Sequence, residues 1–291
     1  MSTSRKAALA LIATVVAFAM PIGSPAQSAS APPVAAEVLK QAEDAMMVDP
    51  KQVLGLTGQA LKQIDRAPPS LEREQARARA LWLSGEASGR LTDIPSAERA
   101  IDQALALIVK VQPQSVLHAR ILMSRGATAL DKGEVQRAFT SFRDAFDLFR
   151  KLGDTRGQAL ALQSIGTIYS DAGDHERVLR YYSQSAEVHP NDASLSMSAL
   201  NNQGLAYKEL KQLDRAQADF RKALAIARKL KSPMLEARIL TNIAGVELAQ
   251  GRLQDAQRTA DRGLGIASGE AAECPRFSTR PCGCGGPKPT P

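Results

Sequence analysis

The sequence predicts an all-α fold in which antiparallel helix pairs follow one another along the chain. Hydrophobic residues make up 44% of the 291 residues, whereas aromatic residues make up only 4%. A core of mostly Ala, Leu and Ile suits closely packed helices better than a β-sandwich. No segment shows the alternation of a strand. The third observation is an internal repeat, which is clearest in residues 158–190.

Residues 158–190 have the pattern of two amphipathic helices that meet at a tight turn around Gly173. Gly166 stands where the two helices must approach closely, and Tyr182 on the second helix is large enough to fill the groove between them. Pro190 closes the unit. The segment therefore predicts a helical hairpin with small residues where its helices touch and large residues in the groove between them.

Four further segments repeat this layout when they are aligned on the position of Gly166. The aligned positions are 41, 40, 38 and 40 residues apart. In chain order the small residues are Gly85, Gly126, Gly166, Gly204 and Ala244. The additional copies cover residues 78–111, 119–152, 197–230 and 237–270. Five copies in phase predict a repeat array rather than a single globule.

This pattern resembles the tetratricopeptide (TPR) repeat, with Gly166 at its eighth position and Pro190 at its thirty-second. The resemblance implies a right-handed TPR superhelix, an α-solenoid in which each helix pair covers the next. The spacing exceeds the usual repeat by about one helical turn and a linker. We expect the extra residues after the second helix, where 150–153 resembles 228–231. Such longer repeats resemble those of bacterial regulators and peptide-binding motor light chains.

Residues 1–31 have the layout of a secretory signal peptide. Arg5 and Lys6 precede a short apolar run, and small residues allow cleavage after Ala26 or Ala31. The alternatives are an uncleaved anchor or a buried first helix, although the run is short for a membrane span. We expect export to a bacterial periplasm, with no stable membrane insertion after signal cleavage.

Residues 32–69 predict a degenerate helix pair that caps the array. Residues 70–268 hold the array of about five repeats. Within it, Ser70 and Asp154 are expected to cap helices, and Ser232 is expected to act as an N-cap before Pro233. These local signals agree with the helix starts that the repeat implies.

Residues 269–291 contain five prolines, four glycines and all three cysteines, and they predict a disordered tail. A cut or shifted reading frame is the alternative. Cys274, Cys282 and Cys284 lack a fourth ligand, so we expect no metal site, although one disulfide can form in an oxidising compartment.

We find no pattern of catalytic residues and expect neither an enzyme nor a cofactor. His118, His175 and His189 occupy unrelated repeat positions, and phosphate-binding, zinc-hydrolase and nucleophile motifs are missing. The net charge of the chain is +7, but the basic and acidic residues are interspersed along the predicted helices. Without a basic block that carries aromatic residues, we expect no nucleic-acid binding.

The TPR resemblance implies that the first helix of each pair lines a concave face that binds a peptide or protein partner. The residues predicted to contact it are Trp82, Arg120, Gln163, Ser164, Asn201, Asn202, Arg238 and Asn242. Asn202 and Asn242 recur one repeat apart, and their amides can pair with a peptide backbone of any sequence. The alternative is that they face water, and Trp82 is either a packing residue or an anchor.

The overall pattern also resembles the periplasmic input region of bacterial signalling proteins, without their catalytic motifs. Our leading hypothesis is therefore an exported protein-interaction module, possessing at most the sensory half of such a protein. The alternative hypothesis is a structural scaffold for an envelope complex. The Lys and Asn pattern that grips chaperone C-terminal carboxylates is missing from the corresponding positions.

Overall fold

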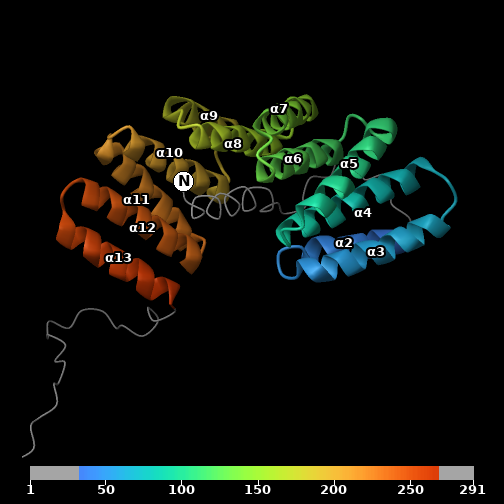
Figure 1. The fold of residues 1–291 in the computed structure, drawn as a ribbon, viewed down its shortest axis with the longest axis horizontal. Helices are drawn as coiled ribbons and strands as arrows, with labels where there is room; N and C mark the ends of the chain where they lie inside the picture. Colours follow the sequence, from blue (N-terminus) through green and yellow to red (C-terminus); the bar gives the residue numbers. More distant parts are fainter. Residues whose placement is uncertain (1–32, 269–291) are drawn as a thin grey trace, which may run out of the picture.

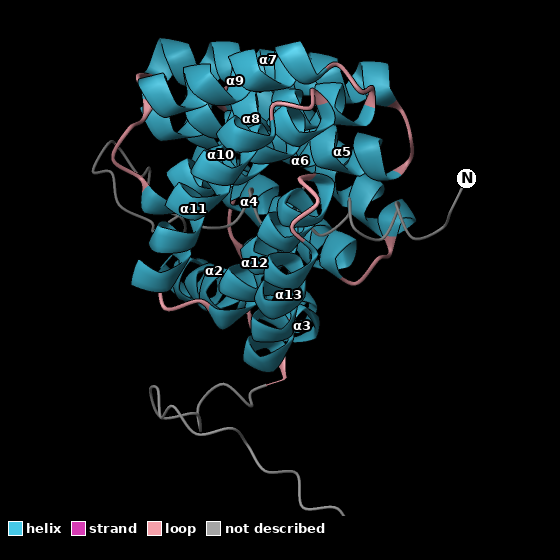
Figure 2. Cartoon of the chain, turned by 90° about the vertical axis from the view of Figure 1, so that its left-hand side faces the viewer, coloured by secondary structure: helices cyan, strands magenta, loops and turns pink. Residues whose placement is uncertain are grey.

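A computed structural model describes residues 33–268, which form an arch of antiparallel helix pairs (Figure 1). The pairs are α2 (Pro33–Ala45) with α3 (Pro50–Arg66), α4 (Leu71–Arg90) with α5 (Ile94–Val111), α6 (Val116–Asp131) with α7 (Val135–Leu152), α8 (Thr155–Asp171) with α9 (His175–Val188), α10 (Ala193–Glu209) with α11 (Leu213–Lys229), and α12 (Pro233–Ala249) with α13 (Leu253–Ala267). Between residues 33 and 268 there is no strand (Figure 2). The prediction of an all-α repeat superhelix is confirmed.

The first helices of successive pairs also contact one another. Such contacts join α2 to α4, α4 to α6, α8 to α10, and α10 to α12. In Figure 1, α6 and α8 lie on the hollow side of the arch, below α7 and α9. The first helices therefore line the hollow side of the arch, its inner wall, in two runs, α2, α4 and α6 and then α8, α10 and α12, within which residues far apart in the sequence meet.

The aligned glycines lie where a second helix presses against a first helix. A Cβ atom on Gly126 would lie 2.4 Å from the Phe142 ring. The same construction gives 2.8 Å from Gly166 to Tyr182. For Gly204 the neighbouring ring belongs to Phe220, at 2.7 Å. These contacts leave no room for a larger side chain, so the small-to-large pattern in the sequence is a packing requirement.

Apart from the α2–α3 pair, the turn inside each hairpin holds one residue in the left-handed conformation. Gly133, Gly173 and Gly251 supply it, with φ values of 78°, 74° and 77°. In two other hairpins, Thr92 and Lys211 adopt φ of 62° and 60°. Because left-handed backbone costs an ordinary residue roughly 1 kcal/mol or more, the turn geometry prevails over local preference at these two positions.

The helix starts show where the longer repeat places its extra residues. Asp154 accepts a hydrogen bond from Gly157 N at 2.8 Å, and Ser70 accepts one from Arg73 N at 3.1 Å, so both act as predicted caps. Ser232 stands at the N-cap before Pro233 but makes no capping bond. Helices α8, α10 and α12 each begin several residues before the predicted repeat start. The extra length therefore extends the first helix as well as the second.

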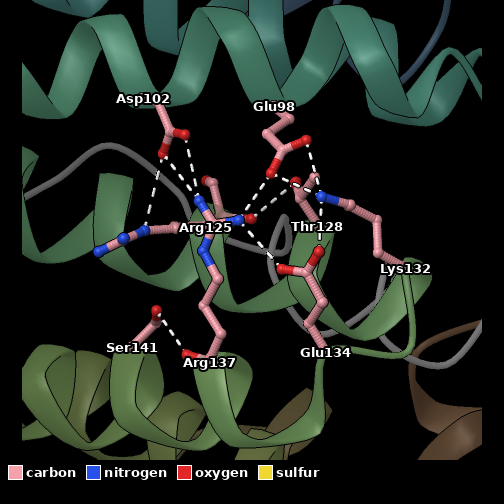
Figure 3. Close-up of polar contacts among 9 residues, drawn as sticks. Glu98, Asp102, Arg125, Thr128, Lys132, Glu134, Arg137 and Ser141 are labelled. Atoms are coloured by element: carbon pink, nitrogen blue, oxygen red, sulfur yellow. Dashed lines mark hydrogen bonds and ion pairs between the residues drawn. The ribbon is translucent and has the colours of Figure 1, made fainter.

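A network of charged side chains joins α5 to α6 and α7 (Figure 3). Arg137 Nη1 lies 2.6 Å from Glu98 and 3.0 Å from Glu134, and its Nη2 lies 3.1 Å from Asp102. Lys132 bonds Glu98 at 2.8 Å. Hydrogen bonds from Lys132 and Arg137 lower the pKa values of Glu98 and Glu134. Because these groups neutralise one another, the network joins two repeats and is not an open site.

In the part of the chain that the structure describes, no helix is long and apolar enough to cross a membrane. The predicted signal peptide, residues 1–31, and the predicted tail, residues 269–291, lie outside the described residues.

Candidate functional site

A pocket of about 290 Å³ opens on the inner wall among α8, α10 and α12. Its apolar lining consists of Leu160, Leu195, Met197, Leu205 and Leu235. Its polar lining consists of Arg156, Gln163, Ser194, Ser198, Asn201, Asn202, Arg238 and Asn242. An apolar surface with a few convergent polar groups is the usual composition of a ligand site.

The asparagines predicted to bind a peptide lie at this pocket, and two of them pair with each other. Asn242 Nδ2 donates a hydrogen bond to Asn201 Oδ1 at 2.9 Å, which links α12 to α10. Asn202 Nδ2 donates to the Ser198 carbonyl one turn earlier, also at 2.9 Å. An amide has two donor hydrogens and an acceptor oxygen, so each side chain keeps capacity for a further partner.

Gln163 forms a wall of the pocket and is fully buried. Its Nε2 donates to Ser185 Oγ at 3.1 Å and to the Leu195 carbonyl at 3.0 Å. These bonds tie α8 to α9 and α10. Because both amide hydrogens are used, Gln163 fixes the shape of the pocket rather than offering a free donor.

The two arginines of the pocket are in different electrostatic settings. Arg156 Nε lies 2.8 Å from Asp192. Burial would raise the pKa of Asp192, but hydrogen bonds from Leu195 N and Arg156 hold that pKa below its ordinary value. Arg238 has no such carboxylate: burial lowers its pKa, and its Nε is buried without a hydrogen-bond acceptor.

The other predicted contact residues do not line this pocket. Trp82 is buried, and its indole N–H donates to Ser124 Oγ at 2.8 Å across α4 and α6. Arg120 lies on α6, where burial lowers its pKa and the charges of Glu43 and Asp154 partly oppose that effect. Ser164 is on α8, outside the lining. The predicted set is therefore divided between two stretches of the inner wall.

Sequence reasoning missed the apolar and N-terminal parts of the pocket. Arg156, Leu195 and Leu235 belong to the first turns of α8, α10 and α12, which precede the predicted repeat starts. Leu160 and Ser198 occupy the same repeat position as Arg120 and Arg238. A prediction that took every residue at that repeat position, whatever its type, would have included Leu160 and Ser198.

Within residues 33–268, no group of three or more His, Cys, Asp or Glu side chains could hold a metal ion. The three cysteines considered in the sequence analysis lie outside the described residues.

The tetratricopeptide repeat family model matches residues 117–191 and 195–268, which together make up just over half of the chain. This chain belongs to the tetratricopeptide repeat family. The resemblance stated from Gly166 and Pro190 is therefore confirmed. Repeats of this family form protein-interaction modules and are typically non-enzymatic scaffolds.

Two curated relatives are photosystem I assembly proteins Ycf3. The protein from Rippkaea orientalis is 31% identical over 103 residues, which is 35% of this chain and 56% of the relative. The protein from Acaryochloris marina is 31% identical over 132 residues, which is 42% of this chain and 75% of the relative. The similarity thus spans little more than half of the first relative and three quarters of the second.

Two solved structures share the fold of this TPR chain. BtubC from P. vanneervenii has a TM-score of 0.66 and 20% identity, with 82% of this chain and 99% of that chain covered. A Rap protein complexed with competence and sporulation factor has a TM-score of 0.59 and 14% identity, with 81% and 76% covered. At these identities the likeness concerns the fold alone.

Proposed function

We propose that this TPR protein binds an extended segment of a partner protein in the pocket among α8, α10 and α12, and that it acts by binding rather than by catalysis. The observation that carries this proposal is the pocket itself, where Leu160, Leu195 and Leu235 lie beside the amides of Asn202 and Asn242. A partner's apolar side chain would be buried against the leucines. The amides would pair with its backbone.

A protein segment suits this pocket better than a nucleic acid does. The lining has two arginines, of which Arg156 is already paired with Asp192, and it contains no aromatic side chain for base stacking. Backbone amides of a peptide, in contrast, match the donor and acceptor groups of asparagine. The Rap protein of similar fold was solved in complex with a factor. That complex supports the capacity of the fold to hold a ligand.

A peptide array tests the binding site directly. The full chain, purified with a C-terminal tag, is applied to an array of blocked synthetic peptides. Ser198→Phe places a ring in the pocket, whereas Ser170→Phe makes the same change at an exposed position on α8 outside the lining. We expect peptides retained by wild type and Ser170→Phe to be lost by Ser198→Phe. Retention of all peptides by Ser198→Phe would refute the proposed site.

We propose further that the protein is exported and works in a bacterial periplasm as the sensory region of a signalling protein. The support is the charged and apolar pattern of residues 1–31. Expression of the full chain in a bacterium, osmotic shock and N-terminal sequencing provide the test. The expected released protein begins at Gln27 or Pro32. An uncleaved chain in the cytoplasmic fraction would refute export.

The second candidate function is a scaffold for assembly of a multiprotein complex. Its support is the similarity to photosystem I assembly proteins, which covers 35–42% of this chain. A scaffold must hold two different partners at once, whereas a sensory module needs one. Once partners are captured, their co-sedimentation with wild type and with Ser198→Phe distinguishes a scaffold from a sensory module. A second partner that still binds Ser198→Phe would favour the scaffold.

A further inference from the structure

Three arginines occupy the same repeat position on the inner wall, six residues before the aligned small residue. Arg79 Nε donates to Glu43 Oε1 at 2.7 Å. Arg120 forms no ion pair with a described residue and its Nε lacks an acceptor, but the charges of Glu43 and Asp154 act on it. Arg238 forms no ion pair with any described residue, and its Nε has no acceptor. Of these three arginines, Arg238 is therefore the one on which no carboxylate of the described residues acts.

The surroundings of Arg238 supply no carboxylate that could act as its counterion. The pocket lining contains no Asp or Glu. Asp192, which is close to the other pocket arginine, is used by Arg156 and by the N-terminus of α10. Holding a partly buried cation without a partner costs free energy that an added carboxylate would return. The pocket therefore favours an anionic group in its occupant.

A second cation, Lys208, lies where α10 meets α12. Lys208 Nζ lies 3.3 Å from the position of a Cβ atom on Gly245, and Lys208 forms no ion pair among the described residues. Gly245 is two helical turns from Arg238, or roughly 10 Å along α12. The amide pair of Asn201 and Asn242 lies between these two ends.

We infer that the segment bound by this TPR protein is acidic, with an Asp or Glu side chain paired to Arg238 and an apolar neighbour against Leu160, Leu195 and Leu235. This inference rests on the proposed function. A carboxylate matches the planar donor set of a single guanidinium. The apolar lining beside it selects a side chain of a protein segment over a free inorganic anion.

The binding test uses two pools of blocked synthetic peptides that are identical except that every Glu in one pool is Gln in the other. Arg238→Gln removes the cation, and Arg221→Gln makes the same charge change at an exposed position on α11. We expect wild type and Arg221→Gln to prefer the Glu pool by about tenfold or more, and Arg238→Gln to lose that preference.

Stability of the free protein gives a readout that needs no ligand. Removing an uncompensated cation should leave the thermal midpoint of Arg238→Gln at or above that of wild type. Arg79→Gln should lower it, because Glu43 then loses its partner. A lower midpoint for Arg238→Gln would show that Arg238 has a structural partner, and it would overturn the inference.

The remaining outcomes separate this inference from the proposed function. Equal binding of both pools by wild type, still blocked by Ser198→Phe, would overturn the acidic preference and leave the site intact. Binding of neither pool, together with an empty peptide array, would overturn both. Displacement of the Glu pool by micromolar inorganic phosphate would indicate a small-anion site and would also overturn the inference.

Discussion

The two halves of the inner wall use the same repeat positions in different ways. Along α2, α4 and α6 the polar groups pair across helices, as Arg79 does with Glu43 and Trp82 with Ser124. Along α8, α10 and α12 there is a pocket, and Arg238 at the position of Arg79 lacks a carboxylate. The first half thus pairs more of its polar groups within the wall, although Arg120 Nε there also lacks an acceptor, and the second half contains the pocket.

This difference shows how a repeat protein can form a pocket on its inner wall without changing its fold. Each inner-wall position is repeated, but what it can do depends on the residue opposite it in the next repeat. Trp82 and Asn201 occupy one equivalent position, and Ser124 and Asn242 occupy another. Both pairs bridge successive first helices. These two repeat positions therefore form a hydrogen bond between successive first helices in both halves. The residues around that hydrogen bond determine whether a pocket is present beside it.

The largest loss of stability is expected from Trp82→Ala, in the half of the inner wall formed by α2, α4 and α6. This change removes a buried indole and leaves Ser124 without its donor. Large-to-small changes of this kind cost about 3–5 kcal/mol, measured here by urea unfolding. Leu71→Ala, on the same helix at 63% exposure, is the control, with an effect within about 0.5 kcal/mol. Loss of peptide binding with little loss of stability would instead identify Trp82 as an anchor.

The next effect concerns the half that contains the pocket. Gly204→Leu drives a side chain into the Phe220 ring, which lies 2.7 Å from the position of a Cβ atom. Overpacking of this kind typically costs ~1–3 kcal/mol, and it should lower the thermal midpoint. Gly55→Ala meets nothing within 4 Å and should stabilise α3, because Ala is favoured over Gly in a helix. Equal midpoints for the two variants would contradict the glycine alignment.

A smaller effect is expected from Arg137→Met in the charged network of the first half. Arg137 contacts Glu98, Glu134 and Asp102, but its side chain is 29% exposed. The loss should be about 1 kcal/mol at low salt and should shrink in concentrated salt, because screening weakens exposed pairs. Urea unfolding at two salt concentrations measures it. Arg143→Met, at 56% exposure, should change stability less; a larger loss there would argue against the network.

The fold was predictable because each hairpin repeats a local pattern that is written in the sequence. Gly126 and Phe142 stand at recurring positions of the repeat, and the structure shows that they contact each other. The bridge from Asn242 to Asn201 was not predictable, because its atoms come from residues 41 positions apart and meet only after two pairs stack. Likewise, Leu195 and Leu235 lie in the added first turns, which a standard repeat consensus does not contain.

The smallest change in thermal stability is expected at Glu86, on α4 in the first half of the inner wall. Burial raises the pKa of this carboxyl above 4.5, despite a hydrogen bond from Ser124 and the charge of Arg90. A carboxyl with a raised folded pKa opposes folding when it is ionised, and this cost disappears as the pH falls through that pKa. Glu86→Gln should therefore raise the thermal midpoint slightly at pH 7, within about 2 °C, and match wild type below pH 4.5. The measurement is a series of thermal melts at different pH, with Glu72→Gln, at an exposed position near the start of α4, as control. A midpoint that falls at pH 7 would show instead that the ionised Glu86 stabilises the fold through its charge interaction with Arg90.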